Sequence, residues 1–250
     1  MLILTQFILR LSFGMALGMA GTDPRLVTSG YYRNHLYVLL GLNVLATMAA
    51  LGDRGQLVLA PPLAAAILCY VGAALWLYEK PRPGIICLAI ISGISLAGAW
   101  ADTSWPSNSQ PMATWIAALD PLSGGLVLGL TLAAMFLGHW YLNSPTMALG
   151  PLRRLIALMA IAIGVRAMVE AAWLVLVVQG PPLALDAWAF IALRWLAGIV
   201  GALVVALMAW QTLKIPNTQS ATGILYVGVI VTFLGELTSL LLATQIQTPL

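Results

Sequence analysis

Charged residues are scarce in this sequence. Of its 250 residues, 11 are Lys or Arg and 8 are Asp or Glu, which is 8% in all. A soluble domain carries about 25% charged residues, so this chain has too few to cover a surface that faces water. Hydrophobic residues make up 61% of it, and the mean hydropathy is +0.97. This composition argues against a soluble domain and predicts an all-α membrane protein, with residues 1–250 as a single integral membrane domain.

Cysteine and the common catalytic motifs are also almost absent. Cys69 and Cys87 lie in apolar stretches, with no CxxC pair and no histidine at zinc spacing, which predicts buried apolar side chains. The sequence lacks a phosphate-binding glycine loop, a GxSxG nucleophile motif and an HExxH zinc motif. The net charge of +3 is spread over isolated residues and forms no basic cluster. We therefore expect neither an enzyme that acts on its own nor a nucleic-acid partner.

Long apolar runs are what the sequence has in abundance. A helix needs about 20 residues to cross the hydrocarbon layer of a membrane. Runs near this length predict eight transmembrane helices, at about 2–20, 34–51, 57–78, 84–100, 122–142, 153–177, 187–212 and 222–244. Arg10 in the middle of the first run argues for a membrane helix there, not a signal peptide. In the longest connection, 101–121, we expect Trp115–Leu119 to lie along the membrane surface.

Lys and Arg residues alternate between the connecting loops. Short loops rich in these residues stay on the cytoplasmic side of a membrane. The opposite set of loops carries only Arg54, beside Asp53. The first, third, fifth and seventh loops carry Arg25 with Arg33, Lys80 with Arg82, Arg153 with Arg154, and Lys214. This pattern predicts that the N and C termini are both non-cytoplasmic, in what we expect to be the bacterial cytoplasmic (inner) membrane.

A short pattern recurs in the two halves of the chain. Met15–Gly18, followed by a proline and then Arg33, has a counterpart in Met135–Gly138, followed at similar spacing by a proline and Arg154. Each copy covers a helix end, a loop and the next helix start. The pattern predicts two four-helix halves of the same orientation, 1–121 and 122–250, as in parallel-repeat membrane folds. A chance match between low-complexity apolar segments is the alternative.

Five ionisable residues fall inside the predicted helices. A charge in the bilayer costs at least about 2.5–3.5 kcal/mol, so such residues mark internal ion pairs or functional sites. Counting along the helices places them in one layer of the outer half: Arg10, Arg166, Glu170, Arg194 and Glu236. In one interpretation they pair and hold helices one, six, seven and eight together. In the other they line a cavity, near Trp173 and Trp195, that relays protons or binds a quinol head or an anionic substrate.

The two histidines form a second candidate site. His35 and His139 lie near the predicted cytoplasmic ends of helices two and five, at about equal depth. Two histidines from facing helices are a known axial ligand pair for b-type haem, which is one interpretation. Hydrogen bonding at the membrane interface is the other.

The whole chain resembles the quinol-interacting membrane anchors of the polysulfide reductase and dimethyl sulfoxide reductase type, in helix number, outside termini and short loops. The resemblance is one of topology. It implies that four charged residues contact quinol: Arg166, Glu170, Arg194 and Glu236. It also implies partner subunits, so that the chain is a multi-pass subunit of a respiratory or other redox complex. A small transporter with a buried charged site and a structural or assembly subunit are the alternatives.

Overall fold

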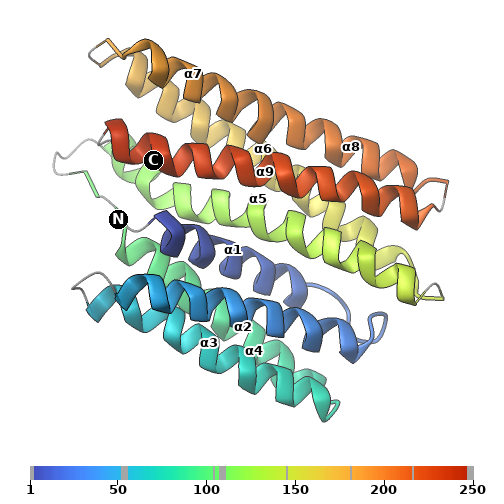
Figure 1. Cartoon of the computed structure of the whole chain (residues 1–250). Helices are drawn as coiled ribbons and strands as arrows, with labels where there is room; N and C mark the ends of the chain where they lie inside the picture. The colour runs from blue at the N-terminus through green and yellow to red at the C-terminus, as the bar shows by residue number, and fades with distance from the viewer. Residues whose placement is uncertain are drawn as a thin grey trace.

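The computed structural model describes residues 3–51, 56–103, 105–106, 111–144, 146–180, 182–215 and 217–246. These ranges contain helices and no strand (Figure 1). The helices are α1 (Ile3–Ala20), α2 (Ser29–Leu51), α3 (Gln56–Leu77), α4 (Pro81–Ala101), α5 (Pro111–Asn143), α6 (Gly150–Val178), α7 (Leu185–Leu193), the π-helix η1 (Arg194–Gly201), α8 (Ala202–Thr212) and α9 (Thr218–Ile246).

Eight helical segments of the described residues are long and apolar enough to cross a membrane, which confirms the predicted number. Of these, α7, η1 and α8 run on from one another and make one span, Leu185–Thr212. The largest difference from the sequence prediction is at α5, which begins at Pro111 and not at 122. Trp115–Leu119 is therefore the first part of this long helix, which continues through Pro121. Neighbouring helices in a membrane protein satisfy the backbone groups that such a proline frees.

Some sequence predictions fall on residues that the structure does not describe. Asp53 and Arg54, which contribute to the predicted orientation, and Pro145, which belongs to the predicted repeat, lie outside the described residues. The two cysteines are described, and both are buried as predicted.

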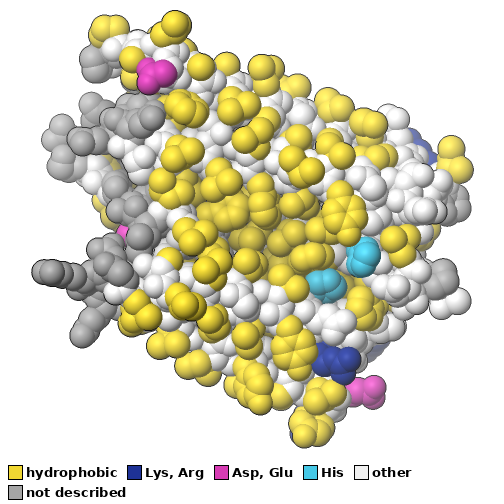
Figure 2. All heavy atoms as spheres, viewed as in Figure 1, with side chains coloured by type: hydrophobic (Ala, Val, Ile, Leu, Met, Phe, Trp, Pro, Cys, Tyr) yellow, Lys and Arg dark blue, Asp and Glu magenta, His cyan; other side chains and the backbone are white. Residues whose placement is uncertain are grey.

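The surface in Figure 2 is that of a membrane-spanning bundle. On the face shown, hydrophobic side chains cover the middle of the molecule, and the Lys, Arg, Asp and Glu side chains lie at its two ends. Both chain ends lie at one end of the bundle, which we call the terminal end (Figure 1). Exposed residues include large apolar side chains such as Met48, Ile67 and Leu196. Lipid tails are the solvent that suits this surface.

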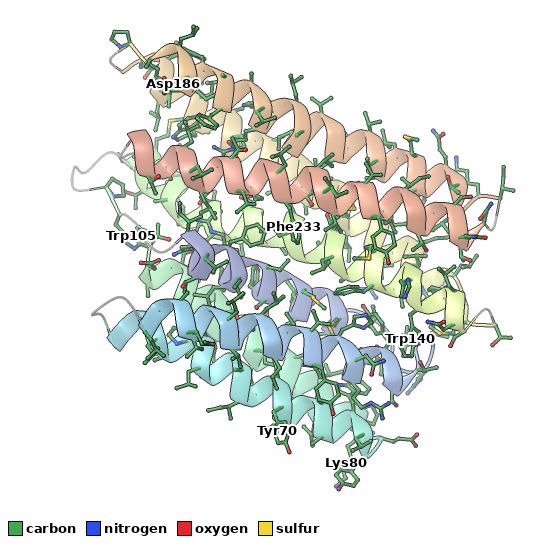
Figure 3. All side chains as sticks on the ribbon, in the orientation of Figure 1. Tyr70, Lys80, Trp105, Trp140, Asp186 and Phe233 are labelled. Atoms are coloured by element: carbon green, nitrogen blue, oxygen red, sulfur yellow. The ribbon has the colours of Figure 1, made fainter. Side chains whose placement is uncertain are left out.

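The helices pack as two groups of four spans. In the first group α2 packs against α3, α3 against α4, and α4 against α1. In the second group α5 packs against α6 and α9, and α9 packs against the span formed by α7, η1 and α8. The main contact between the groups is α1 against α5 (Figure 1). Phe7 of α1 and Phe233 of α9 add an edge-to-face contact with ring centroids 5.0 Å apart, near the middle of the bundle (Figure 3).

Glycines let α1 and α5 approach with their backbones in contact. A Cβ atom built on Gly14 would overlap the carbonyl oxygen of Gly125, and one built on Gly129 would overlap the backbone of Gly14 and Met15. One turn further on, Gly18 faces Ala133. Small residues at four-residue spacing are the usual means of close packing between membrane helices, because lipid offers no hydrophobic drive to bring them together.

We expect Gly129→Val to destabilise the protein by about 1–3 kcal/mol, because the added side chain forces α1 and α5 apart. Thermal unfolding of the detergent-solubilised protein measures the change. Gly93→Val is the matched control, since a Cβ on Gly93 meets nothing within 4 Å. Equal losses in the two variants would contradict the role of this crossing.

Candidate functional site

The five charged residues predicted to share a layer are brought together in the structure, and a sixth joins them. Each is at most 5% exposed. Together they form one connected network of ion pairs, which we call the charge network: Arg10 of α1, Asp120 of α5, Arg166 and Glu170 of α6, Arg194 of η1 and Glu236 of α9. The network therefore connects five of the eight spans, where sequence reasoning expected four.

Arg166 is the centre of the charge network. Its Nε and Nη2 donate to the two carboxylate oxygens of Glu236, at 2.8 and 2.9 Å. Its Nη1 donates to Oδ1 of Asp120 at 2.6 Å, and the hydroxyls of Ser123 and Ser239 accept further bonds. The paired, two-bond contact with Glu236 is the strongest arrangement that an arginine makes with a carboxylate. Arg166 thus holds α5, α6 and α9 together.

Glu170 takes part in two ion pairs. It lies one turn after Arg166 on α6, and its Oε1 is 3.0 Å from Nε of Arg166, as their spacing predicts. The same oxygen pairs with Nη2 of Arg194. The guanidinium of Arg194 also lies over the ring of Trp173, with Cζ 5.5 Å from the ring centroid. Arg194 is the first residue of η1, and π-helical turns inside α-helices often lie at functional sites.

Arg10 of α1 connects the charge network to the first group of helices. Its Nη2 is 2.6 Å from Oδ2 of Asp120. Its Nε donates to Oε1 of Gln6 at 3.4 Å, and Gln6 Nε2 donates to the carbonyl of Ala99 and to Oδ2 of Asp102 at 2.9 and 3.2 Å. Asp102 follows the end of α4 and is half-buried. A continuous line of polar groups therefore runs from the charge network toward the terminal end.

Sequence reasoning missed Asp120. The pair Asp120-Pro121 is typical of a loop, and it falls within 101–121, the longest predicted connection. Charge balance was the available signal. The five predicted residues comprise three arginines and two glutamates, which leaves one positive charge in lipid without a partner. With Asp120 the charge network holds three positive and three negative side chains, which is the balance that burial requires.

Glycines make room for the charge network. A Cβ on Gly124 would lie 2.5 Å from Oε2 of Glu236 and 3.3 Å from Nη2 of Arg166. On the other side, Gly198 of η1 and Gly235 of α9 are in backbone contact, since a Cβ on either would overlap the other. Gly124, Gly125, Gly129 and Gly198 are thus positions where a side chain would meet a neighbouring helix.

Four buried polar atoms on Glu170, Arg194 and two tryptophans have no hydrogen-bond partner among the described residues. They are Oε2 of Glu170, Nη1 of Arg194 and the indole Nε1 atoms of Trp173 and Trp195. A buried polar atom without a partner costs about 1–3 kcal/mol, more when the group is charged. Arg194 pairs with Glu170 and lies over Trp173, and Trp195 packs against the apolar cluster that contains Trp173, so we group these residues as the Glu170 corner. This is the arrangement expected of a site that binds a polar ligand or water.

An apolar groove of about 530 Å³ lies between α5 and α6. Its lining is Met112, Trp115, Ile116 and Leu119 of α5 with Val165, Met168, Val169 and Ala172 of α6. Trp115 and Met168 are exposed, whereas Ile116 and Val169 are buried at its floor. The groove therefore opens on the lipid-facing surface of the second group of helices.

The two histidines lie together on the face shown in Figure 2, toward the end opposite the termini. Nδ1 of His35 donates to the carbonyl of Tyr31 at 2.6 Å, and Nδ1 of His139 is 3.2 Å from the hydroxyl of Tyr226. Both therefore make the hydrogen bonds of the interfacial interpretation. The bond from His35 Nδ1 also fixes the tautomer whose Nε2 is an acceptor, as in metal-ligating histidines. No group of three or more His, Cys, Asp or Glu side chains suited to a metal ion occurs among the described residues.

Comparison of the chain with protein-family models, with curated proteins and with solved structures gave no match.

Proposed function

We propose that this multi-pass membrane protein is the quinol-binding membrane subunit of a redox complex. The Glu170 corner carries the proposal, because its unpartnered atoms suit the two oxygens of a quinone or quinol head. Oε2 of Glu170 accepts a bond from a quinol hydroxyl. Nη1 of Arg194 and the indole N–H groups of Trp173 and Trp195 donate to the oxygens of the oxidised ring. The aromatic face of Trp173 and the buried setting exclude water from the head group.

Oxidation of a quinol to a quinone releases two electrons and two protons. Glu170 is placed to accept the two protons one after the other at Oε2, since this oxygen has no bond to Arg166 or Arg194 that protonation would break. It passes the first proton to water at the terminal end before it takes up the second. The electrons pass to a redox centre of a partner subunit.

A structural role is the second candidate, and the equal numbers of positive and negative side chains in the charge network favour it. In that role Arg166 and its partners join the helices and bind no substrate. Two measurements on the protein, purified gently from its native membrane, separate these candidates and a transporter. Bound quinone and co-purifying redox subunits, found by mass spectrometry, support the proposal. An isolated protein that carries solute flux in vesicles supports a transporter, and a complex without quinone supports the structural role.

The histidine pair gives the haem interpretation its own test. His35 and His139 are the residues that would hold a b-type haem, His35 through its free Nε2. An optical spectrum of the purified protein is the measurement. A Soret band lost in His35→Ala supports haem, and a spectrum without a Soret band leaves the histidines as interfacial hydrogen-bonding residues.

We also propose that the terminal end faces the non-cytoplasmic side, since the loops rich in Lys and Arg lie at the opposite end. Asp186 and Lys80 are exposed and lie at opposite ends of the bundle (Figure 3). In a variant with Cys69 and Cys87 replaced by Ala, we expect Asp186→Cys to react with a membrane-impermeant maleimide on intact bacterial spheroplasts. Lys80→Cys is expected to react only after the membrane is opened. The reverse pattern would contradict this orientation.

A further inference from the structure

The apolar groove between α5 and α6 lies at the level of the charge network. On α6, the groove residues Val165, Val169 and Ala172 alternate with Arg166 and Glu170, which point into the protein. Side chains one position apart on a helix differ by about 100° in direction, so the two sets occupy adjacent faces of the same turns. The groove therefore lies on the face of α6 next to the face that carries Arg166 and Glu170.

On α5 the groove leads to the same place. Met112, Ile116 and Leu119 follow one face of the helix, and Asp120 comes directly after them. Ile116 and Val169 also belong to a buried apolar cluster that contains Trp173. Trp173 in turn packs against Arg194. The floor of the groove is thus continuous with the wall of the Glu170 corner.

The occupant of the groove is limited by its position and its lining. It opens within the apolar belt, between the exposed side chains of Trp115 and Met168, where only lipid-soluble molecules are at hand. Its lining consists of hydrophobic side chains without a charged group, and its volume of about 530 Å³ lies within the usual range for small-molecule sites. A flexible hydrocarbon chain fits such a groove, and a polar head does not.

We propose that this groove holds the isoprenoid tail of the quinol whose head binds at the Glu170 corner. This inference rests on the proposed function, and it adds the part of the ligand that the corner does not contact. The tail lies against Met112, Ile116 and Val169, and the head lies beyond Trp173. The groove thus gives a lipid-borne ligand a route from the bilayer to a buried polar site.

The test fills the groove and compares two quinones that share one head group. Ala172→Phe adds a ring to the groove, and Ala171→Phe adds the same ring at the neighbouring exposed position, outside the lining. Equilibrium binding of decylubiquinone and of its tailless parent, 2,3-dimethoxy-5-methylbenzoquinone, is measured on the full chain in nanodiscs. We expect Ala172→Phe to weaken binding of decylubiquinone roughly tenfold and to leave the tailless quinone within about twofold. Ala171→Phe should change neither.

Each other outcome overturns a definite part of the inference. If Ala172→Phe leaves both affinities unchanged but removes a co-purified phospholipid, the groove holds a lipid and not the tail. If it weakens both quinones equally, the ring disturbs the head site and the groove assignment fails. If the unaltered protein binds neither quinone, the proposed function itself fails. A thermal unfolding curve for Ala172→Phe that matches the unaltered protein shows that the variant is folded.

Discussion

Asp120→Ala is expected to destabilise the folded protein by about 3–5 kcal/mol, the usual cost of removing one partner from a buried ion pair. Asp120 is the partner of both Arg10 and Arg166, so its loss leaves two guanidinium groups in a low-dielectric interior with less compensation. It also removes the ion pair that connects the two groups of helices. We expect a lower melting temperature in detergent and less folded protein in the membrane.

The control for this prediction is a second change that restores neutrality. Asp120→Ala combined with Arg10→Met removes one charge of each sign, and we expect it to recover part of the lost stability, since uncharged pairs of similar size often replace buried ion pairs at little cost. Asp186→Ala, at an exposed position, should cost less than about 1 kcal/mol. If the double variant is less stable than Asp120→Ala alone, Arg10 does not act through Asp120.

Glu170→Gln is expected to weaken quinol binding by about 10- to 100-fold, because a hydrogen bond to a charged group is worth about 1.5–3 kcal/mol. Glutamine keeps an oxygen that accepts bonds from Arg166 and Arg194, but it loses the charge and the ability to take up a proton. Equilibrium binding of the reduced ligand, decylubiquinol, to the purified variant under anaerobic conditions measures the first effect, and quinol oxidation in the native complex measures the second. We expect oxidation to fall further than binding.

A structural role for Glu170 makes a different prediction, and a double variant distinguishes the two. Glu170→Gln with Arg194→Gln removes one charge of each sign from the network, so it should restore thermal stability relative to Glu170→Gln. If the Glu170 corner binds quinol, the double variant is stable and still binds weakly, since both Glu170 and Arg194 lose their contacts with the ligand. Binding that recovers together with stability would show that neither side chain contacts quinol and that the pair only holds α6 and η1 in place.

Hydropathy was sufficient to predict the spans, because a helix in lipid must be apolar over its whole length and each of the eight runs meets that requirement. The depth of the buried charges followed from the same reasoning, since 1.5 Å per residue converts position into depth. The ion-pair partners of these charges could not be predicted from the sequence, except for Glu170, which lies one helical turn after Arg166. The bond between Arg166 and Glu236 joins residues far apart in the chain, and they meet because α6 and α9 both pack against α5 and α8.

Two features of the candidate site had no clear sequence signal. The π-helix at Arg194–Gly201 lies in an apolar run that predicts an ordinary helix, and its Gly198 is in backbone contact with Gly235 of α9. The groove between α5 and α6 depends on the extension of α5 back to Pro111, through a proline that the sequence pattern indicates as a break. Neither feature follows from local sequence preference.

The contact between α1 and α5 has a consequence for how the chain enters the membrane. α1 is synthesised before α5, so Arg10 meets its carboxylate partner only when α5 has been made. Until then an arginine on an isolated helix faces lipid, at a cost of about 2.5–3.5 kcal/mol. The glycine face of α1 is equally without its partner. α1 must therefore be held by the insertion machinery, or lie near the membrane surface, while α2, α3 and α4 are inserted. Its packing against α5 is a step that follows insertion.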